Sequence, residues 1–323
     1  MDAPAQAASG KDGVLVVGSI NDDLIVFQDR LPRRGETLVG HHLRESFGGK
    51  GANQAVQASR MGARVSLVGA VGQDLRGRSC LENLREEGIE CRVRTAQEDT
   101  GVGVEHIVDG DVFATIVPGA NARVDPEWVT CQEDLFRTAS VVVLQNEIPA
   151  ESNVQAVRLA RLHGARVVYN AAPARAADPA MMRECDYLVV NEEEAQHYLG
   201  SRITDLDDPQ ETARAVTALR HLSPGVIMTL GERGSHVAVN GEVHHVPAVP
   251  AQVVDATGAG DSFVGAFAAA LDGGRDDLGA AILASHVAAR TVTGAGAQTS
   301  MPRYKDLSDE AVRAQGGDSH PAA

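Results

Sequence analysis

Residues 52–88 read ANQAVQASRMGARVSLVGAVGQDLRGRSCLENLREEG, and this stretch shows the alternation of helices and strands that continues along the chain. Ala52–Met61 has helical character and stops at Gly62, Val65–Val71 is an apolar run of strand length, and the helical Leu75–Glu87 is followed by another glycine. A glycine directly after the last turn is a common end signal for a helix. Short apolar strands that alternate with helices predict a parallel sheet covered by helices on both faces.

The rest of the chain continues this alternation. Further strands are expected at 14–17, 141–144, 166–169, 187–190 and 226–230, and further helices at 152–163, 192–199, 211–221, 261–271 and 278–292. Two hairpins are predicted by Asp109-Gly110 and Asn240-Gly241, each of which lies between β-branched runs. We therefore expect an α/β fold with a doubly wound, mostly parallel sheet flanked by helices.

Two stretches, 22–46 and 98–118, break the alternation. Their composition suits a small antiparallel β flap, here called the lid, on the edge of the main unit. The sequence contains no internal repeat and no Pro/Ser linker, so we expect one domain over residues 13–303. Residues 1–12 are expected to form a disordered tail, and residues 304–323 a C-terminal helix or tail.

The chain has 323 residues, of which 44 are acidic and 29 basic, and its formal charge is −15. This balance argues against nucleic acid and against a basic membrane surface as partners, because binding to either needs positive charge. No uncharged apolar run approaches the ~18 residues of a membrane span, and the first residues do not resemble a signal peptide. We expect a cytoplasmic protein, whose four scattered cysteines stay reduced.

Glycine-rich loops that follow strands are the usual ligand sites of doubly wound sheets. The glycines beside Lys50 and Asp261 match neither the Walker P-loop nor the dinucleotide fingerprint, so a nicotinamide dehydrogenase is a remote alternative. The loop Phe47–Gln54 is either a plain entry to a helix or a ligand loop. Only three of the 29 basic residues are lysine, and Lys50 is the only one between residues 12 and 304, which favours a required ammonium group.

Two further loops each allow two interpretations. Thr257–Asp261 opens a predicted helix, whose first N–H groups form an anion-binding concavity. Asp261 either complements the helix dipole or takes a proton from a hydroxyl that attacks a phosphoryl group. Asn191–Glu194 either forms a capping box or holds Mg²⁺ through water with Glu194.

Taken together, these segments resemble the ribokinase family of carbohydrate kinases over roughly residues 13–303. The motifs of the resemblance are Gly18–Asp23, Gly48–Gln54, Gln145–Glu147, Asn191–Glu194, Thr229–Gly234, Asp255–Asp261 and Gly296–Gln298. Each motif is a weak signal by itself, whereas all of them in this order are specific.

The resemblance implies ATP-dependent phosphorylation of the 5-hydroxyl of D-ribose. Asp261 would be the catalytic base, and the N–H groups of Thr257, Gly258, Ala259 and Gly260 would stabilise charge on the transferring phosphoryl group. The implied sugar-binding residues are Asn21, Asp23, Gly49, Lys50, Asn53, Glu147 and Asp261. The implied ATP-binding residues are Asn191, Thr229, Gly231, Glu232, Gly234, Gly260 and Ser285.

The resemblance also implies two cations and a dimer. Glu194 would support Mg²⁺ through water. An activating K⁺ would be held, largely by backbone carbonyls, at Asp255, Thr257, Thr291, Gly294, Gly296 and Ser300. The lid would cover the sugar and pair two subunits, so that the implied partners are a small sugar, ATP and a second copy of the chain.

One lid strand departs from the family, which tends to be apolar there, because it carries Glu105 and His106. If either side chain faces the sugar, the substrate need not be ribose, and deoxyribose, another pentose or a nucleoside is the alternative. At the adenine end, Ser285-His286 stands where other members often have Asn or His. A non-catalytic sugar- or nucleotide-binding regulator is a more remote alternative, which the intact Asp261 and its neighbouring glycines disfavour.

Overall fold

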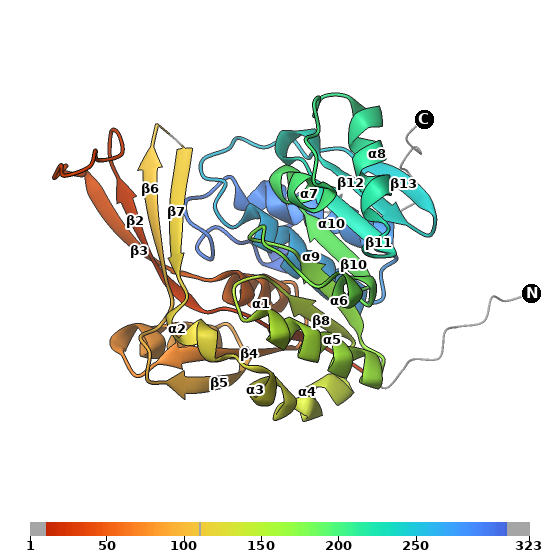
Figure 1. Ribbon diagram of the computed structural model, residues 1–323, viewed down its shortest axis with the longest axis horizontal. Coiled ribbons are helices and arrows are strands. Elements are labelled where there is room, and N and C mark those ends of the chain that lie inside the picture. The colour runs from red at the N-terminus through yellow and green to blue at the C-terminus, as the bar shows by residue number, and fades with distance from the viewer. Residues whose placement is uncertain (1–10, 110, 309–323) are drawn as a thin grey trace, which may run out of the picture.

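The computed structural model describes residues 11–109 and 111–308. Its larger sheet has nine strands in the order β13-β12-β11-β10-β9-β8-β1-β4-β5 (Figure 1). All neighbouring strands are parallel except the pairs β11–β12 and β12–β13, so the predicted mostly parallel sheet is confirmed. Its strands are β1 (Val14–Val17), β4 (Val65–Gly72), β5 (Glu90–Ala96), β8 (Val141–Leu144), β9 (Arg166–Asn170), β10 (Tyr187–Val190), β11 (Gly225–Thr229), β12 (Ser235–Val239) and β13 (Glu242–Val246).

Helices cover both faces of this sheet and create two apolar cores. Val14 and Val16 of β1 pack into a core with α1, α2, α9 and α10, whereas Leu15 and Val17 pack into a core with α3 to α8. All four residues of β1 are buried because side chains alternate between the two covered faces. The helices are α1 (Lys50–Arg60), α2 (Leu75–Glu86), α3 (Pro126–Thr130), α4 (Glu133–Thr138), α5 (Ala150–His163), α6 (Pro179–Arg183), α7 (Glu192–Leu199), α8 (Pro209–Leu219), α9 (Ala259–Asp272) and α10 (Asp277–Thr291).

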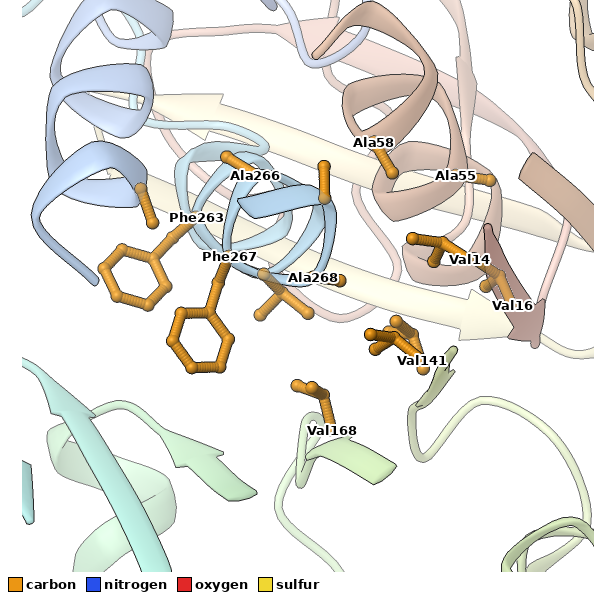
Figure 2. Packing of buried hydrophobic residues seen from close by; sticks show 14 of the residues in the cluster. Val14, Val16, Ala55, Ala58, Val141, Val168, Phe263, Ala266, Phe267 and Ala268 are labelled. Atoms are coloured by element: carbon orange, nitrogen blue, oxygen red, sulfur yellow. The ribbon is translucent and has the colours of Figure 1, made fainter. Parts of the chain in front are cut away.

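The contact between α1 and α9 positions the future site. Figure 2 shows Phe263 and Phe267 of α9 pointing into the same core as Ala55 and Ala58 of α1. The two helices approach so closely that a Cβ atom on Gly265 would lie 2.5 Å from the backbone oxygen of Gln54. A glycine is therefore required at this crossing, which brings the first turn of α9 beside the first turns of α1.

The lid is a separate four-stranded sheet in the order β3-β2-β6-β7, and it projects from one edge of the main body (Figure 1). Its strands are β2 (Asn21–Phe27), β3 (His42–Gly48), β6 (Val102–Val108) and β7 (Asp111–Val117). The pairs β2–β3 and β6–β7 are antiparallel as predicted, whereas the central pair β2–β6 is parallel. Two parallel strands need a long connection, and here the chain passes through α1, β4, α2 and β5 before it returns to the lid.

Several elements differ from the prediction. The strand β5 and the short helices α3, α4 and α6 were not predicted, and α9 begins at Ala259 rather than at Asp261. Residues 304–306 form one turn of 3₁₀ helix, whereas Gly110 of the predicted hairpin and residues 1–10 and 309–323 of the predicted tails lie outside the described residues. Within 11–109 and 111–308, no helix has the length and apolarity to cross a membrane.

Candidate active site

The centre of the site is the first turn of α9. Gly258 caps this helix with φ of 78°, a left-handed conformation, and a Cβ atom there would lie 2.8 Å from the Cβ of Ala297. Glycine is thus the residue that allows the chain to turn into α9 against this neighbour. The first N–H groups of a helix have no partner within it, so this turn has the polarity of an anion site. In this structure the Ala259 N–H donates to the Ala256 carbonyl just before the helix, at 3.2 Å.

Asp261 lies in that turn and is held by two amides of α1. Its Oδ2 accepts a hydrogen bond from Asn53 Nδ2 at 2.9 Å, and its Oδ1 accepts one from Gln54 Nε2 at 2.9 Å. The side chain is 7% exposed. Burial raises the pKa of Asp261 above its ordinary value, against the opposing effects of Lys50 and the two amides. A fixed carboxylate with a raised pKa is the expected form of a general base.

Two further amide side chains hold Asn53 and Gln54 in place. Gln298 donates to Asn53 Oδ1 at 3.0 Å, and Gln145 donates to Gln54 Oε1 at 2.7 Å. Gln145 and Gln298 each lie in a motif that carries the family resemblance, but no role was predicted for their side chains. The sequence signal for Gln54 is its place in the motif Gly48–Gln54.

Lys50 is the first residue of α1 and lies among carboxylates. Its backbone N–H donates to Glu147 Oε2 at 3.0 Å, and the same oxygen accepts a hydrogen bond from Ser19 Oγ at 2.6 Å. Burial alone would lower the pKa of the Lys50 ammonium, but Asp261 and Glu147, with smaller effects from other carboxylates, hold that pKa above its ordinary value. Lys50 therefore stays charged, and the loop Phe47–Gln54 is more than an entry to a helix.

The lid adds Asp23 to this cluster. Asp23 Oδ1 accepts a hydrogen bond from the Gly103 N–H at 2.9 Å, and a Cβ atom on Gly48 would overlap Asp23 Oδ2 at 1.7 Å. Burial, followed by the charge of Glu105, raises the pKa of Asp23 to about 7. Ionisation of the Asp23 carboxyl group is therefore unfavourable until a ligand donates hydrogen bonds to it.

The other predicted sugar residues line the same place. Asn21 at the start of β2 is 1% exposed, and its Oδ1 accepts a hydrogen bond from Asn121 Nδ2 at 2.8 Å. No sequence signal had singled out Asn121, which lies in a 3₁₀ turn at 119–123. Gly49 has φ of 84°, and a Cβ atom there would lie 2.7 Å from the Asn21 N atom. The structure thus brings Asn21, Asp23, Gly49, Lys50, Asn53, Glu147 and Asp261 to one region where the lid meets the main sheet.

Most of the predicted nucleotide residues lie at the carboxyl ends of two neighbouring strands, whereas Gly260 lies on α9 and Ser285 on α10. Asn191 comes after β10 and forms a full capping box with Glu194, whose Oε2 accepts from the Asn191 N–H at 2.9 Å. The capping interpretation is confirmed. Burial raises the pKa of Glu194, and the opposing effect of Lys50 shows that this carboxylate belongs to the same charge cluster.

Thr229 ends β11 beside β10, and its hydroxyl donates to the Val190 carbonyl at 3.4 Å. The turn that follows, with Gly231 and Glu232, is a 3₁₀ helix that ends at Gly234, where φ is 84°. Ser285 lies on α10 and donates to the Ala281 carbonyl of its own helix at 3.0 Å. The hydroxyl of Ser285 is therefore hydrogen-bonded within its own helix in this structure.

The predicted potassium residues lie in two joined loops. Asp255 Oδ1 accepts from the Thr257 N–H at 2.9 Å, and its Oδ2 accepts from the Gly296 N–H at 2.8 Å and from Arg44 Nη2 of the lid at 3.2 Å. These contacts outweigh burial and lower the pKa of Asp255. Thr291 shares a 2.8 Å hydrogen bond with Ser262 of α9, and a Cβ atom on Gly294 would contact Ser300 Cβ at 2.8 Å.

Oxygen atoms dominate these two loops, so their donor set fits a hard monovalent cation. Across residues 11–109 and 111–308, no group of three or more His, Cys, Asp or Glu side chains converges as a metal site. A K⁺ site built from carbonyls would not form such a group.

A cavity of about 760 Å³ lies beside the cluster rather than over Asp261. Its walls include Asp22, Phe47, Arg76 and Asn83, and the network around Asp261 reaches it only through Gln298. Asn83 Nδ2 donates to Gln298 Oε1 at 2.8 Å. The cavity is therefore lined by Gln298, which orients Asn53, and not by the reactive carboxylate of Asp261.

Comparisons with known proteins agree with this fold. The model of the pfkB family of carbohydrate kinases matches residues 11–303. A ribokinase of Lactococcus lactis is 35% identical over 299 residues, which cover 91% of this chain and 95% of the relative, and a deoxyribokinase of Salmonella typhi is 32% identical over 300 residues, with 92% and 97% covered. The solved structure of an Arabidopsis thaliana ribokinase complexed with ribose and ATP is 32% identical, with a TM-score of 0.84 and 91% and 97% of the two chains covered.

The chain belongs to the pfkB family of carbohydrate kinases. Within that family it is similar to ribokinases, and it is an ATP-dependent sugar kinase. The resemblance stated from the sequence motifs is thereby confirmed at the level of family, fold and enzyme class.

Proposed function

We propose that the chain transfers the γ-phosphoryl group of ATP to the 5-hydroxyl of D-ribose. The observation that carries the proposal is the buried Asp261, which lies in the first turn of α9 and is held by Asn53 and Gln54. In this position the carboxylate takes the proton of the attacking hydroxyl. The N–H groups of Gly258, Ala259 and Gly260 stabilise the charge that develops on the transferring phosphoryl group.

The sugar is bound by groups that match its hydroxyls. Asp23 and Glu147 accept hydrogen bonds, whereas Lys50 and the amides of Asn21 and Asn53 donate them. The N–H of Gly49 lies in the same loop. Asn21 and Asp23 come from the lid strand β2, whereas Lys50 and Asn53 come from α1 of the main body. Closure of the lid over the sugar therefore also excludes water from the reacting atoms.

ATP would lie along the carboxyl ends of β10 and β11. Asn191 and the residues Thr229, Gly231, Glu232 and Gly234 line that edge, and Ser285 stands at the far end on α10. When bound, Mg²⁺ supplies positive charge to the phosphates, and the carboxylate oxygen of Glu194 outside the capping box is suited to its water shell.

A K⁺ ion would be bound by the loops that hold Asp255, Thr257, Thr291, Gly294, Gly296 and Ser300. These loops adjoin the first turn of α9 through the hydrogen bond between Ser262 and Thr291. A cation there would steady the loop that precedes Gly258 and add positive charge next to the phosphoryl site.

A second candidate substrate is deoxyribose or another pentose, because the Salmonella typhi relative is a deoxyribokinase at nearly the same identity. A panel of ribose, deoxyribose, other pentoses and nucleosides with ATP and Mg²⁺, run with and without K⁺, decides between these candidates. We expect the highest kcat/KM for ribose and faster turnover with K⁺. Better turnover of deoxyribose or a nucleoside would overturn the ribose assignment but not the kinase assignment.

Sugar affinity should fall as the pH drops below about 7. The pKa of Asp23 is raised to about 7, so below that pH the carboxyl group carries a proton that a hydrogen-bonding sugar must displace. The Kd for ribose should then rise by up to about tenfold per pH unit. Calorimetric titration without ATP between pH 5.5 and 8.5, in buffers of different ionisation enthalpy, measures both Kd and the protons released.

Asp23→Asn is the control for this titration, because it keeps the shape of the side chain but cannot titrate. It should bind ribose more weakly at pH 8, with a Kd that no longer changes with pH. If the Kd of the unmodified protein did not change with pH, Asp23 would not bind the sugar hydroxyls as proposed.

We further propose that the lid pairs two copies of the chain. Its outer face carries the row Leu43, Val26, His106 and Phe113, set by the strand registers. Leu43 is 55% exposed and Phe113 is 44% exposed. Apolar side chains at this density on a projecting sheet indicate a surface that another chain covers.

The double variant Leu43→Glu/Phe113→Glu should be monomeric, because four like charges would meet in the interface of a dimer. Light scattering after size exclusion gives the mass directly. Leu162→Glu is the matched control, since Leu162 on α5 is 68% exposed but far from the lid. A double variant with the same mass as the unmodified dimer would place the interface elsewhere.

A further inference from the structure

The face of the lid that carries Asp23 also carries a second row of side chains, further from the root of the lid. Arg44 of β3 lies opposite Ile25 of β2. Ile25 in turn lies beside Glu105 of β6, and Glu105 lies opposite Ala114 of β7. Side chains two residues apart on a strand share a face, so this row lies on the same face as Asp23. The opposite face holds His106.

Electrostatics agree with this placement of Glu105 near the sugar cluster. After burial, its charge is the largest effect that raises the pKa of Asp23, and it also acts on Lys50. The pKa of Glu105 itself is raised by burial and by Asp255, and lowered by Arg44 and Lys50. Charge effects of this kind are expected where Glu105 and the groups around the sugar site lie close together and are partly shielded from solvent.

Glu105 has an oxygen without a partner. Its Oε2 is buried and accepts no hydrogen bond from any described residue. The neighbouring Arg44 does not satisfy it, since the Arg44 Nη2 donates to Asp255 at 3.2 Å and the buried Arg44 Nε has no hydrogen-bond partner within the described part of the chain. A buried carboxylate oxygen without a donor is costly, and the small side chain of Ala114 across the strand pair does not supply one. A hydroxyl group of a bound ligand can supply the missing donor.

On the basis of the proposed function, we propose that Glu105 is a specificity-determining residue of the sugar pocket, which accepts a hydrogen bond from one hydroxyl of the sugar other than the reacting one. The substrate class that follows is a fully hydroxylated sugar rather than one deoxygenated at that carbon. Loss of the hydroxyl would leave the buried Oε2 of Glu105 unpartnered near Asp23, a situation that binding sites reject strongly.

The test is a thermodynamic cycle like a double-mutant cycle, in which one change removes the Glu105 side chain and the other removes one sugar hydroxyl. Kd is measured for D-ribose and for its 1-deoxy, 2-deoxy and 3-deoxy analogues with the unmodified protein and with Glu105→Ala. If the panel gives another best substrate, that sugar and its monodeoxy analogues are used. One analogue should bind the unmodified protein about 10- to 100-fold more weakly than the parent sugar, yet lose little further affinity in Glu105→Ala. The other analogues should show additive losses.

Two further measurements separate recognition from structure. Glu105→Gln should shift the midpoint of the pH-dependent sugar affinity to lower pH, because the charge that raises the pKa of Asp23 is removed. Glu45→Gln is the matched control on the same lid, since Glu45 lies opposite Leu24 on the other face. It should leave both the cycle and the midpoint unchanged.

The outcomes are distinguishable from those of the proposed function. If a sugar is phosphorylated but all deoxy analogues give additive losses with Glu105→Ala, the role of Glu105 is overturned and the kinase assignment stands. If no sugar in the panel is bound or phosphorylated, the proposed function fails and the role of Glu105 fails with it.

Discussion

Replacing Asp261 with asparagine should lower kcat by about a thousandfold while ribose and ATP still bind. The amide cannot take the proton of the attacking hydroxyl, so the reaction loses its base. The anion site of the first turn of α9 is unchanged, because it consists of backbone N–H groups. A coupled assay of ADP release gives kcat, and calorimetry gives the two Kd values.

The same substitution should also lower stability slightly. Asp261 accepts hydrogen bonds from both Asn53 and Gln54, whereas an asparagine has only one acceptor oxygen and would turn its NH₂ group toward one of these donors. Asp272→Asn, at the other end of α9, is the matched control. Asp272 accepts a hydrogen bond from the Gly13 N–H at 2.8 Å, so this variant should lose stability without losing kcat. Unimpaired turnover in Asp261→Asn would remove Asp261 from the role of base.

The strands at the centre of the sheet could be predicted because burial on both faces makes them continuous apolar runs. The bounds of β1, β8 and β10 agree with the prediction residue by residue. The edge strand β5 (Glu90–Ala96) mixes charged and apolar residues, since most of its side chains remain partly or fully exposed. The helices α3 and α6 have five residues each, too few for a helical period to show in the sequence.

The site was predictable where the backbone itself is constrained. Gly258 and Gly49 need positive φ, and Lys50 stands out in a chain with almost no lysine. The orienting contacts are different, because Asn121 reaches Asn21 across a hundred residues of sequence. No local pattern specifies such a pair. The direction of Glu105 likewise depends on the register between β2 and β6, which only the folded lid defines.

Replacing Lys50 with methionine should reduce kcat/KM by at least about a hundredfold and move the acid limb of the kcat profile to higher pH. The ammonium is the first of the groups that hold down the pKa of Asp261, against the effect of burial. Without it, that pKa rises further above its ordinary value. Since Asp261 acts as a base only when it is ionised, a higher pH is then needed for the same fraction of active enzyme.

The variant should also be less stable at neutral pH. The folded pKa of Lys50 lies above its ordinary value, so the stabilisation by its charge is fully present at pH 7 and disappears only as the pH rises through the folded pKa. Lys50→Met removes it and leaves Asp261 and Glu147 without their counter-charge. Lys305→Met, at an exposed position in the last described turn, is the matched control and should change neither the pH profile nor the thermal midpoint. If Lys50→Met lost sugar affinity but kept the acid limb of kcat in place, Lys50 would serve the sugar alone and the charge coupling to Asp261 would be refuted.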